Sequence, residues 1–156
     1  MRKAAMAAAL ALAAASPATY AQQRPDYGPN ITVEAAKKIA AGTLAECAKN
    51  KWNVAVAIVD THGFLVYFER MENTQSASID IAQGKAKVGA MYRRTTRVFA
   101  EVIAKSGPAV MTLPGVVASP GGVPIFADGK VIGGVGVSGV TGDQDEQCAK
   151  AGIAGM

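Results

Sequence analysis

The sequence predicts a mixed α/β (α+β) domain in which helices pack on an antiparallel sheet of about five strands. Segments with apolar residues at helical spacing alternate with short β-branched segments typical of strands. Turn residues at positions 60–63 and 128–129 connect neighbouring strands as hairpins. Strands joined by hairpins pair antiparallel, and helices bury the apolar face of such a sheet.

The N-terminal residues 1–21 have the three parts of a secretory signal peptide. Arg2 and Lys3 precede an apolar run at 4–15, which is shorter than the ~20 residues that span a bilayer. Small residues before position 22 suit a signal peptidase, so we predict cleavage after Ala21. The alternative is an Ala-rich helix that belongs to the fold. Cleavage implies a periplasmic or secreted protein with no membrane insertion afterwards.

The composition is that of one globular domain and excludes a disordered chain, since 50% of the 156 residues are hydrophobic and only 18% are charged. The formal net charge of +4 includes the two cations of the signal peptide. The remaining charge is nearly balanced, which gives too weak a field for nucleic acid or an anionic membrane surface.

The first half of the domain, which we place at 31–156, predicts a helix, a hairpin and two further helices. A polar lead-in at 22–30 is expected to be mobile. Thr32 is typical of a helix N-cap, and the helix runs to Lys49. The other expected elements are strands at 53–59 and 64–71, a helix at 77–92, and a shorter helix that Thr95 or Thr96 caps and that ends near Lys105.

The second half is rich in glycine and predicts three strands and a closing helix. The strands are expected at 115–119, 123–127 and 130–138, and the helix at 141–155. Cys47 and Cys148 lie in similar contexts on the first and last helices. If these helices are neighbours, a disulfide closes a loop of about 100 residues. Two buried thiols that never meet are the alternative, and two cysteines with one histidine make a poor zinc set.

Residues 134–139 match the pattern G-x-G-x-x-G, but no βαβ unit follows it, so we reject dinucleotide binding. Glycines inside a strand more often mark the close approach of another backbone or a ligand. Ser138 and Gly139 also lead into the last helix, whose N-terminal end suits an anionic group.

The densest basic cluster comprises Arg93, Arg94 and Arg97, with Lys85 and Lys87 on the preceding helix. Arginine pairs well with carboxylates because its fork is planar and bidentate. Apolar and aromatic residues that include Tyr92 precede the cluster, which favours an amphipathic anion such as a haem with its propionates. A solvated helix end is the alternative.

No catalytic set is evident: the sequence lacks nucleophile-elbow, zinc-protease and P-loop motifs. His62 is the only histidine, and we interpret it as a turn residue. Asp60 and Asp145 are interpreted as caps. The residues alone therefore predict an exported binding protein with an anionic ligand, and leave enzymatic activity open.

Several blocks in order resemble one family. The first half reads Val54-x-Val56-x-Ile58-Val59-Asp60-x-x-Gly63-x-Leu65, then Arg70-Met71 and Ile81-Ala82-x-x-Lys85-Ala86. The second half reads Gly121-Gly122-Val123-Pro124-Ile125, Asp128-Gly129-x-Val131-Ile132-Gly133 and Gly136-Val137-Ser138-Gly139. Over residues 31–153 this pattern resembles the GlcG/HbpS-like family of haem-binding and haem-degrading domains, which is related to the C-terminal domain of corrinoid adenosyltransferases.

The resemblance implies a profilin-like fold, homo-oligomers, haem as cofactor, and a place beside membrane sensors or redox proteins. Some relatives use a threonine near the end of the central helix as the axial iron ligand, which corresponds here to Thr95. Others use a histidine near the N-terminus of the domain, which this sequence lacks. Tyr92 and Met71 are further candidate ligands, and His62 is the least favoured.

Three hypotheses follow. The leading one is an exported haem-binding protein whose Lys85, Arg93 and Arg94 face the propionates. The second is an enzyme or accessory protein for a small metabolite, using Asp60, Arg70 and Lys85 beside Ser138 and Gly139. The third is a haem-free sensory partner of a membrane receptor.

Overall fold

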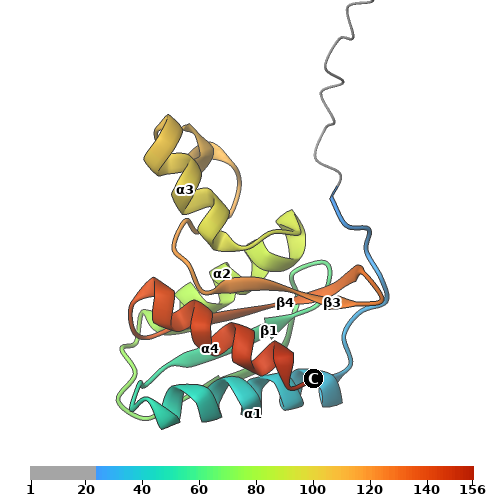
Figure 1. Ribbon diagram of the computed structural model, residues 1–156, viewed down its shortest axis with the longest axis vertical. Helices are drawn as coiled ribbons and strands as arrows, with labels where there is room; N and C mark the ends of the chain where they lie inside the picture. Colours follow the sequence, from blue (N-terminus) through green and yellow to red (C-terminus); the bar gives the residue numbers. More distant parts are fainter. Residues whose placement is uncertain (1–23) are drawn as a thin grey trace, which may run out of the picture.

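The computed structural model describes residues 24–156, so the predicted signal peptide lies outside the described residues. The elements in chain order are α1 (Val33–Lys49), β1 (Ala55–Val59), β2 (Leu65–Arg70), α2 (Ser78–Tyr92), α3 (Thr96–Ser106), the 3-10 helix η1 (Pro108–Thr112), β3 (Gly122–Ala127), β4 (Lys130–Ser138) and α4 (Gly142–Ala154). Figure 1 shows α1 and α4 together, with α3 projecting away from the sheet.

The sheet of the described chain has four strands in the order β2-β1-β4-β3, and all neighbours are antiparallel. The mixed α/β class and the antiparallel sheet are thus confirmed, but the predicted strand at 115–119 does not form. That segment lies between Pro114 and Pro120 and has no neighbouring strand within residues 24–156 to pair with. It makes the return path from η1 to the edge strand β3.

Helices cover both faces of the sheet. As a result, every residue of the central strand β1 is buried. Val54, Val56 and Ile58 face the core shared with α1 and α4. The intervening small residues Ala55 and Ala57 pack with three alanines of α2, namely Ala82, Ala86 and Ala90. These small side chains bring α2 close to the sheet.

Gly136 of β4 marks the closest approach of α2, since a Cβ at this position would collide with the backbone oxygen of Ala82. The glycine motif at 134–139 therefore serves packing, as expected from glycines inside a strand.

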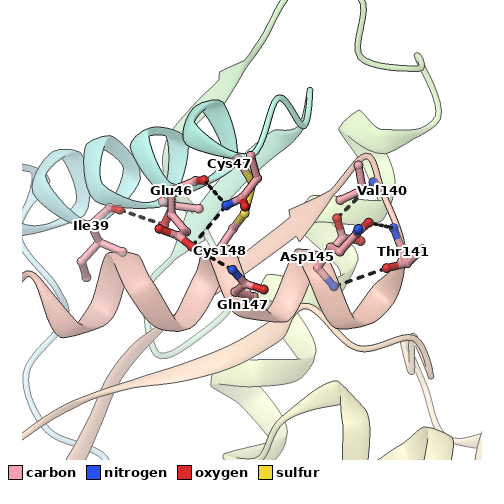
Figure 2. The surroundings of a disulfide bond; sticks show 11 residues. Ile39, Glu46, Cys47, Val140, Thr141, Asp145, Gln147 and Cys148 are labelled. Carbon is pink, nitrogen blue, oxygen red and sulfur yellow. Dashed lines mark hydrogen bonds between the residues drawn. A yellow bond between two sulfur atoms is a disulfide. The ribbon is translucent and has the colours of Figure 1, made fainter.

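A disulfide joins α1 and α4 on one face of the sheet. Cys47 and Cys148 are bonded, with a Cα–Cα distance of 5.7 Å and a sequence separation of 101. Beside the bridge, Gln147 Nε2 donates to Glu46 Oε1 at 2.8 Å (Figure 2) and lowers the pKa of the Glu46 carboxyl. The neighbouring arrangement of the first and last helices, and the bridge it allows, are confirmed.

The segment 24–30 differs from the mobile lead-in that the sequence predicts. Gly28 N donates to Val131 O, and Val131 N donates to Asp26 O, each at 2.8 Å. Ile31 N then donates to Ile132 O at 2.9 Å. β1 pairs with β4 only as far as Gly134. The residues of β4 before Gly134 therefore have backbone groups on that side that can pair with the N-terminal segment.

None of the helices within residues 24–156 has both the length and the apolar character needed to cross a membrane.

Candidate functional site

The β1–β2 turn packs against the C-terminal end of α2 and forms the candidate site. Asp60 Oδ1 accepts hydrogen bonds from His62 N at 2.8 Å and Phe64 N at 2.9 Å, which fixes the turn. Gly63 adopts a φ of +85° and approaches α2 so closely that a Cβ would lie 2.8 Å from Met91 Sδ. The positive φ and this close approach both favour glycine where the turn meets the helix.

A first cavity of about 370 Å³ opens at this junction, and its walls are mainly apolar. Tyr92 Oη donates to Pro114 O at 2.7 Å and joins the end of α2 to the return path of 113–121. The lining residues are His62, Gly63, Phe64, Lys87, Val88, Met91, Tyr92, Pro114 and Gly115.

Two more cavities lie beside the first. The second, of about 520 Å³, shares His62 and Met91 with the first and adds Tyr27, Gly28, Asn30 and Thr61. The third, of about 680 Å³, is polar and is lined by Arg24, Pro25, Asp26, Arg93 and Gly129. The three cavities therefore run along the C-terminal end of α2 and the N-terminal segment.

The arginines of the predicted basic cluster do not share one cavity. Arg93 ends α2 in the left-handed conformation, donates from Nη1 to Pro25 O at 2.8 Å and stacks 4.9 Å above the Tyr27 ring. Arg94 lies instead over the Phe99 ring, at 5.6 Å. Only Arg93 of these two lines one of the three cavities.

Thr95 is the N-cap residue of α3, and its side chain makes no capping hydrogen bond. It lines none of the three cavities, whereas Tyr92 lines the first. Met71 packs against the core on the α1 and α4 side of the sheet. Of the four ligand candidates named from the sequence, only Tyr92 and the least favoured one, His62, line the same cavity.

Lys85 does not face a cavity, contrary to the placement beside propionates that the sequence suggested. Its side chain is 1% exposed, and Nζ lies 2.8 Å from Asp145 Oδ2 and 3.1 Å from Val137 O. Burial raises the pKa of the Asp145 carboxyl, while Lys85 and the Val140 and Gly139 amides oppose this shift. The sequence indicates a helix cap at Asp145 and does not predict that its carboxylate pairs with Lys85.

The residues of the metabolite hypothesis are also dispersed. Arg70 and Ser138 both lie opposite Ala55, at the start of β1, whereas Asp60 follows the end of that strand. Ser138 Oγ donates to Ser78 Oγ at 3.1 Å inside the fold. At the entry to the last helix, which was expected to suit an anionic group, the amide of Val140 donates to the protein's own Asp145 Oδ1 at 3.2 Å.

Phe64 and Met91 are site residues that the sequence analysis did not name, and His62 was named only as the least favoured ligand. Phe64 and Met91 are 71% and 51% exposed, unusually high for such large apolar side chains. One available signal was Phe64 directly after the turn that carries the only histidine. Within residues 24–156 no three His, Cys, Asp or Glu side chains cluster as a metal site.

Comparison with known proteins identifies the family of this chain. Residues 31–154 match the family described as haem-degrading protein HbpS-like. The chain belongs to this HbpS-like family. The resemblance seen in the sequence is thereby confirmed, and the relatives agree with it. Protein GlcG of Escherichia coli strain K12 is 39% identical over 108 residues, which cover 69% of this chain and 81% of GlcG.

Solved structures of the HbpS-like type have the same fold. An HbpS double mutant from Streptomyces reticuli is 30% identical with a TM-score of 0.76, over 98% of this chain and 97% of that chain. A PduOC–haem complex has a TM-score of 0.75 over 81% of this chain and 95% of that chain. Its identity of 24% shows likeness of fold alone.

Proposed function

We propose that this HbpS-like protein is exported and binds haem at the cavity between the β1–β2 turn and the end of α2. The observation that carries the proposal is the set of groups on one mainly apolar wall: the imidazole of His62, the thioether of Met91 and the ammonium of Lys87. Bound haem would supply an iron centre that takes nitrogen, sulfur or oxygen as axial ligand.

The residues present fit such a group. Phe64, Val88 and Met91 offer the apolar surface that a porphyrin plane requires. Lys87 is exposed on the same wall, and a lysine there pairs with a carboxylate such as a propionate. Arg93 supplies a further cation in the neighbouring polar cavity, whereas Lys85 is committed to Asp145.

Two features support export. Residues 1–21 have the composition of a signal peptide. The Cys47–Cys148 bridge is typical of proteins in oxidising compartments such as the periplasm. The family description and the haem bound to the related PduOC fold support the choice of ligand.

A haemin titration of the purified protein, followed at the Soret band, tests the proposal. We expect saturable binding by the wild type and about tenfold weaker binding by Met91→Ala, which removes part of the cavity wall. Met111→Ala is a matched control, because Met111 is 47% exposed and lines none of the three cavities. Equal loss in both variants, or no binding by the wild type, would contradict the proposal.

A second pair of variants tests the anionic edge of the ligand. Lys87→Ala is expected to weaken haemin binding several-fold, whereas Lys105→Ala on α3 leaves it unchanged. Loss of the Soret band over hours with a reductant and dissolved O₂, which together open the porphyrin ring, would assign haem breakdown, and a stable band would assign storage or sensing. Mass photometry with and without haemin tests the expected homo-oligomer.

A further inference from the structure

The ring of His62 is held by a chain of hydrogen bonds that starts in the N-terminal segment. Thr61 Oγ1 donates to Asn30 Oδ1 at 2.5 Å, and His62 Nδ1 lies 3.1 Å from the same hydroxyl. Thr61 N also donates to Asn30 Oδ1, at 3.3 Å. This second bond identifies the Asn30 atom as the oxygen, because only an acceptor can receive the backbone N–H.

Counting protons along this chain assigns the tautomer of the histidine. The Thr61 hydroxyl has one proton, and Asn30 Oδ1 accepts it. The contact between Thr61 Oγ1 and His62 Nδ1 therefore requires the proton on Nδ1. In a neutral imidazole with its proton on Nδ1, the lone pair is on Nε2. That nitrogen has the form that binds a metal.

The structure fixes the residues around this ring. Asn30 precedes Ile31, whose amide is hydrogen-bonded to β4, and Thr61 is 7% exposed. Asp60 fixes the backbone of His62 itself. His62 is exposed and lines both the first and the second cavity. The competing Tyr92 hydroxyl already donates to Pro114 O.

We propose that His62 Nε2 is the axial ligand of the haem iron, and that Thr61 and Asn30 are positioning residues that hold His62 in the competent tautomer. The inference rests on the proposed function, since it names the ligand within the same cavity. It replaces the assignment of Thr95 that the family resemblance suggested.

The single histidine of the chain allows a direct test of the ligand. Tag-free protein is prepared with ¹⁵N-labelled histidine, reduced with haem bound, and examined by resonance Raman spectroscopy. We expect an iron–nitrogen stretching band that shifts with the label and is lost in His62→Gln. A haem complex whose spectrum does not respond to the label overturns the ligand assignment while leaving haem binding intact.

The role of Thr61 is tested first in the apo protein and then by haemin affinity. In the apo protein, the two ring-nitrogen shifts of ¹⁵N-labelled His62 should report a proton on Nδ1. Thr61→Val removes the acceptor and should move the population towards the Nε2–H form, whereas Thr61→Ser keeps the hydroxyl and the wild-type shifts. Loss of an outer partner typically weakens metal binding 10–100-fold, so we expect Thr61→Val to lose about tenfold in haemin affinity. Wild-type shifts and affinity in Thr61→Val would overturn the positioning role.

Discussion

Lys85 of α2 and Asp145 of α4 form an ion pair past the edge of the sheet, with 2.8 Å between Nζ and Oδ2. The two helices pack on opposite faces, so the pair joins both layers. Gly121 makes room for it, because a Cβ there would lie 2.8 Å from Asp145 Cβ and 3.0 Å from Lys85 Nζ. This contact occupies the ammonium group of Lys85, so Lys85 is not free to pair with the carboxylate of a ligand.

Replacing Lys85 by methionine should strongly destabilise the protein. The substitution leaves the Asp145 carboxylate buried without its cation, a change that costs about 3–5 kcal/mol in other proteins. Urea unfolding monitored by circular dichroism measures the loss. Lys105→Met on α3 is the control for removing a lysine. The double variant Lys85→Met with Asp145→Leu should recover much of the lost stability. If its loss of unfolding free energy equals the sum of the losses in the two single variants, the pairing is contradicted.

The cost of Lys85→Met should depend on pH. Burial already raises the pKa of the Asp145 carboxyl, and removing Lys85 raises this pKa further. A carboxyl with a raised folded pKa contributes stability below its unfolded pKa of ~3.9, and loses it as the pH rises through the folded pKa. The difference in unfolding free energy between variant and wild type should therefore be larger at neutral than at acidic pH. An equal difference across this range would show that Asp145 is not the group responsible.

Removal of the disulfide should lower stability without changing the fold. Cys47 and Cys148 are both fully buried, and their bridge closes a loop with a sequence separation of 101. In the chain-entropy model a loop of this size contributes about 4–5 kcal/mol. Thermal unfolding of Cys47→Ala with Cys148→Ala tests the value. Native protein should resist reducing agent in the absence of denaturant, and rapid reduction under those conditions would contradict the buried bridge.

Export should yield a protein that begins at Gln22. Expressed with its own N-terminus in a Gram-negative host, the chain is expected in the periplasmic fraction, lacking residues 1–21 by intact mass. Deleting the apolar run at 4–15 should retain the full-length remainder in the cytosol. Wild-type protein that is absent from the periplasmic fraction and still carries residues 1–21 would be inconsistent with the predicted signal peptide.

Local signals in the sequence were enough for most of the fold. β4 begins and ends at the predicted residues 130 and 138, because a two-residue turn precedes it and a helix cap follows it. Thr141, where the last helix was expected to begin, caps α4 through reciprocal bonds with Gln144. The expected strand at 115–119 failed because apolar residues alone do not supply a pairing partner.

The site could not be predicted to the same extent, because tertiary contacts create it. Turn chemistry accounts for Asp60 and Gly63, but nothing local shows that this turn rests on Met91. Asn30 lies 31 positions before Thr61 in the chain, so their hydrogen bond depends on the N-terminal segment pairing with β4. Lys85 looked available for the same reason: its partner Asp145 is 60 positions away.

Arg97 should control how firmly α3 is attached to the rest of the protein. Its guanidinium lies 2.6 Å from Asp143 Oδ1 and 2.6 Å from Glu146 Oε2, and both carboxylates raise the pKa of Arg97. Few residues of α3 are buried, so these bonds are a large part of its attachment. Arg97→Ala should speed hydrogen–deuterium exchange in α3, with little change in β1. Arg94→Ala, which removes only a contact with Phe99, is the comparison; equal exchange in both variants would contradict this role.

Gly63 should matter more for haemin binding than for folding. Alanine at this position must adopt a φ of +85°, which costs an L-residue about 1–2 kcal/mol, and its Cβ displaces the flexible end of Met91. Gly129→Ala is the control for backbone strain, because Gly129 has a φ of +73° with no atom near the added Cβ, and it lines only the third cavity and not the first, where haem is proposed to bind. Both variants should therefore lose similar stability in urea unfolding, while only Gly63→Ala weakens haemin binding. The comparison separates backbone strain from the shape of the cavity: equal haemin affinity in the two variants would show that the junction of the turn and α2 does not form the haem site.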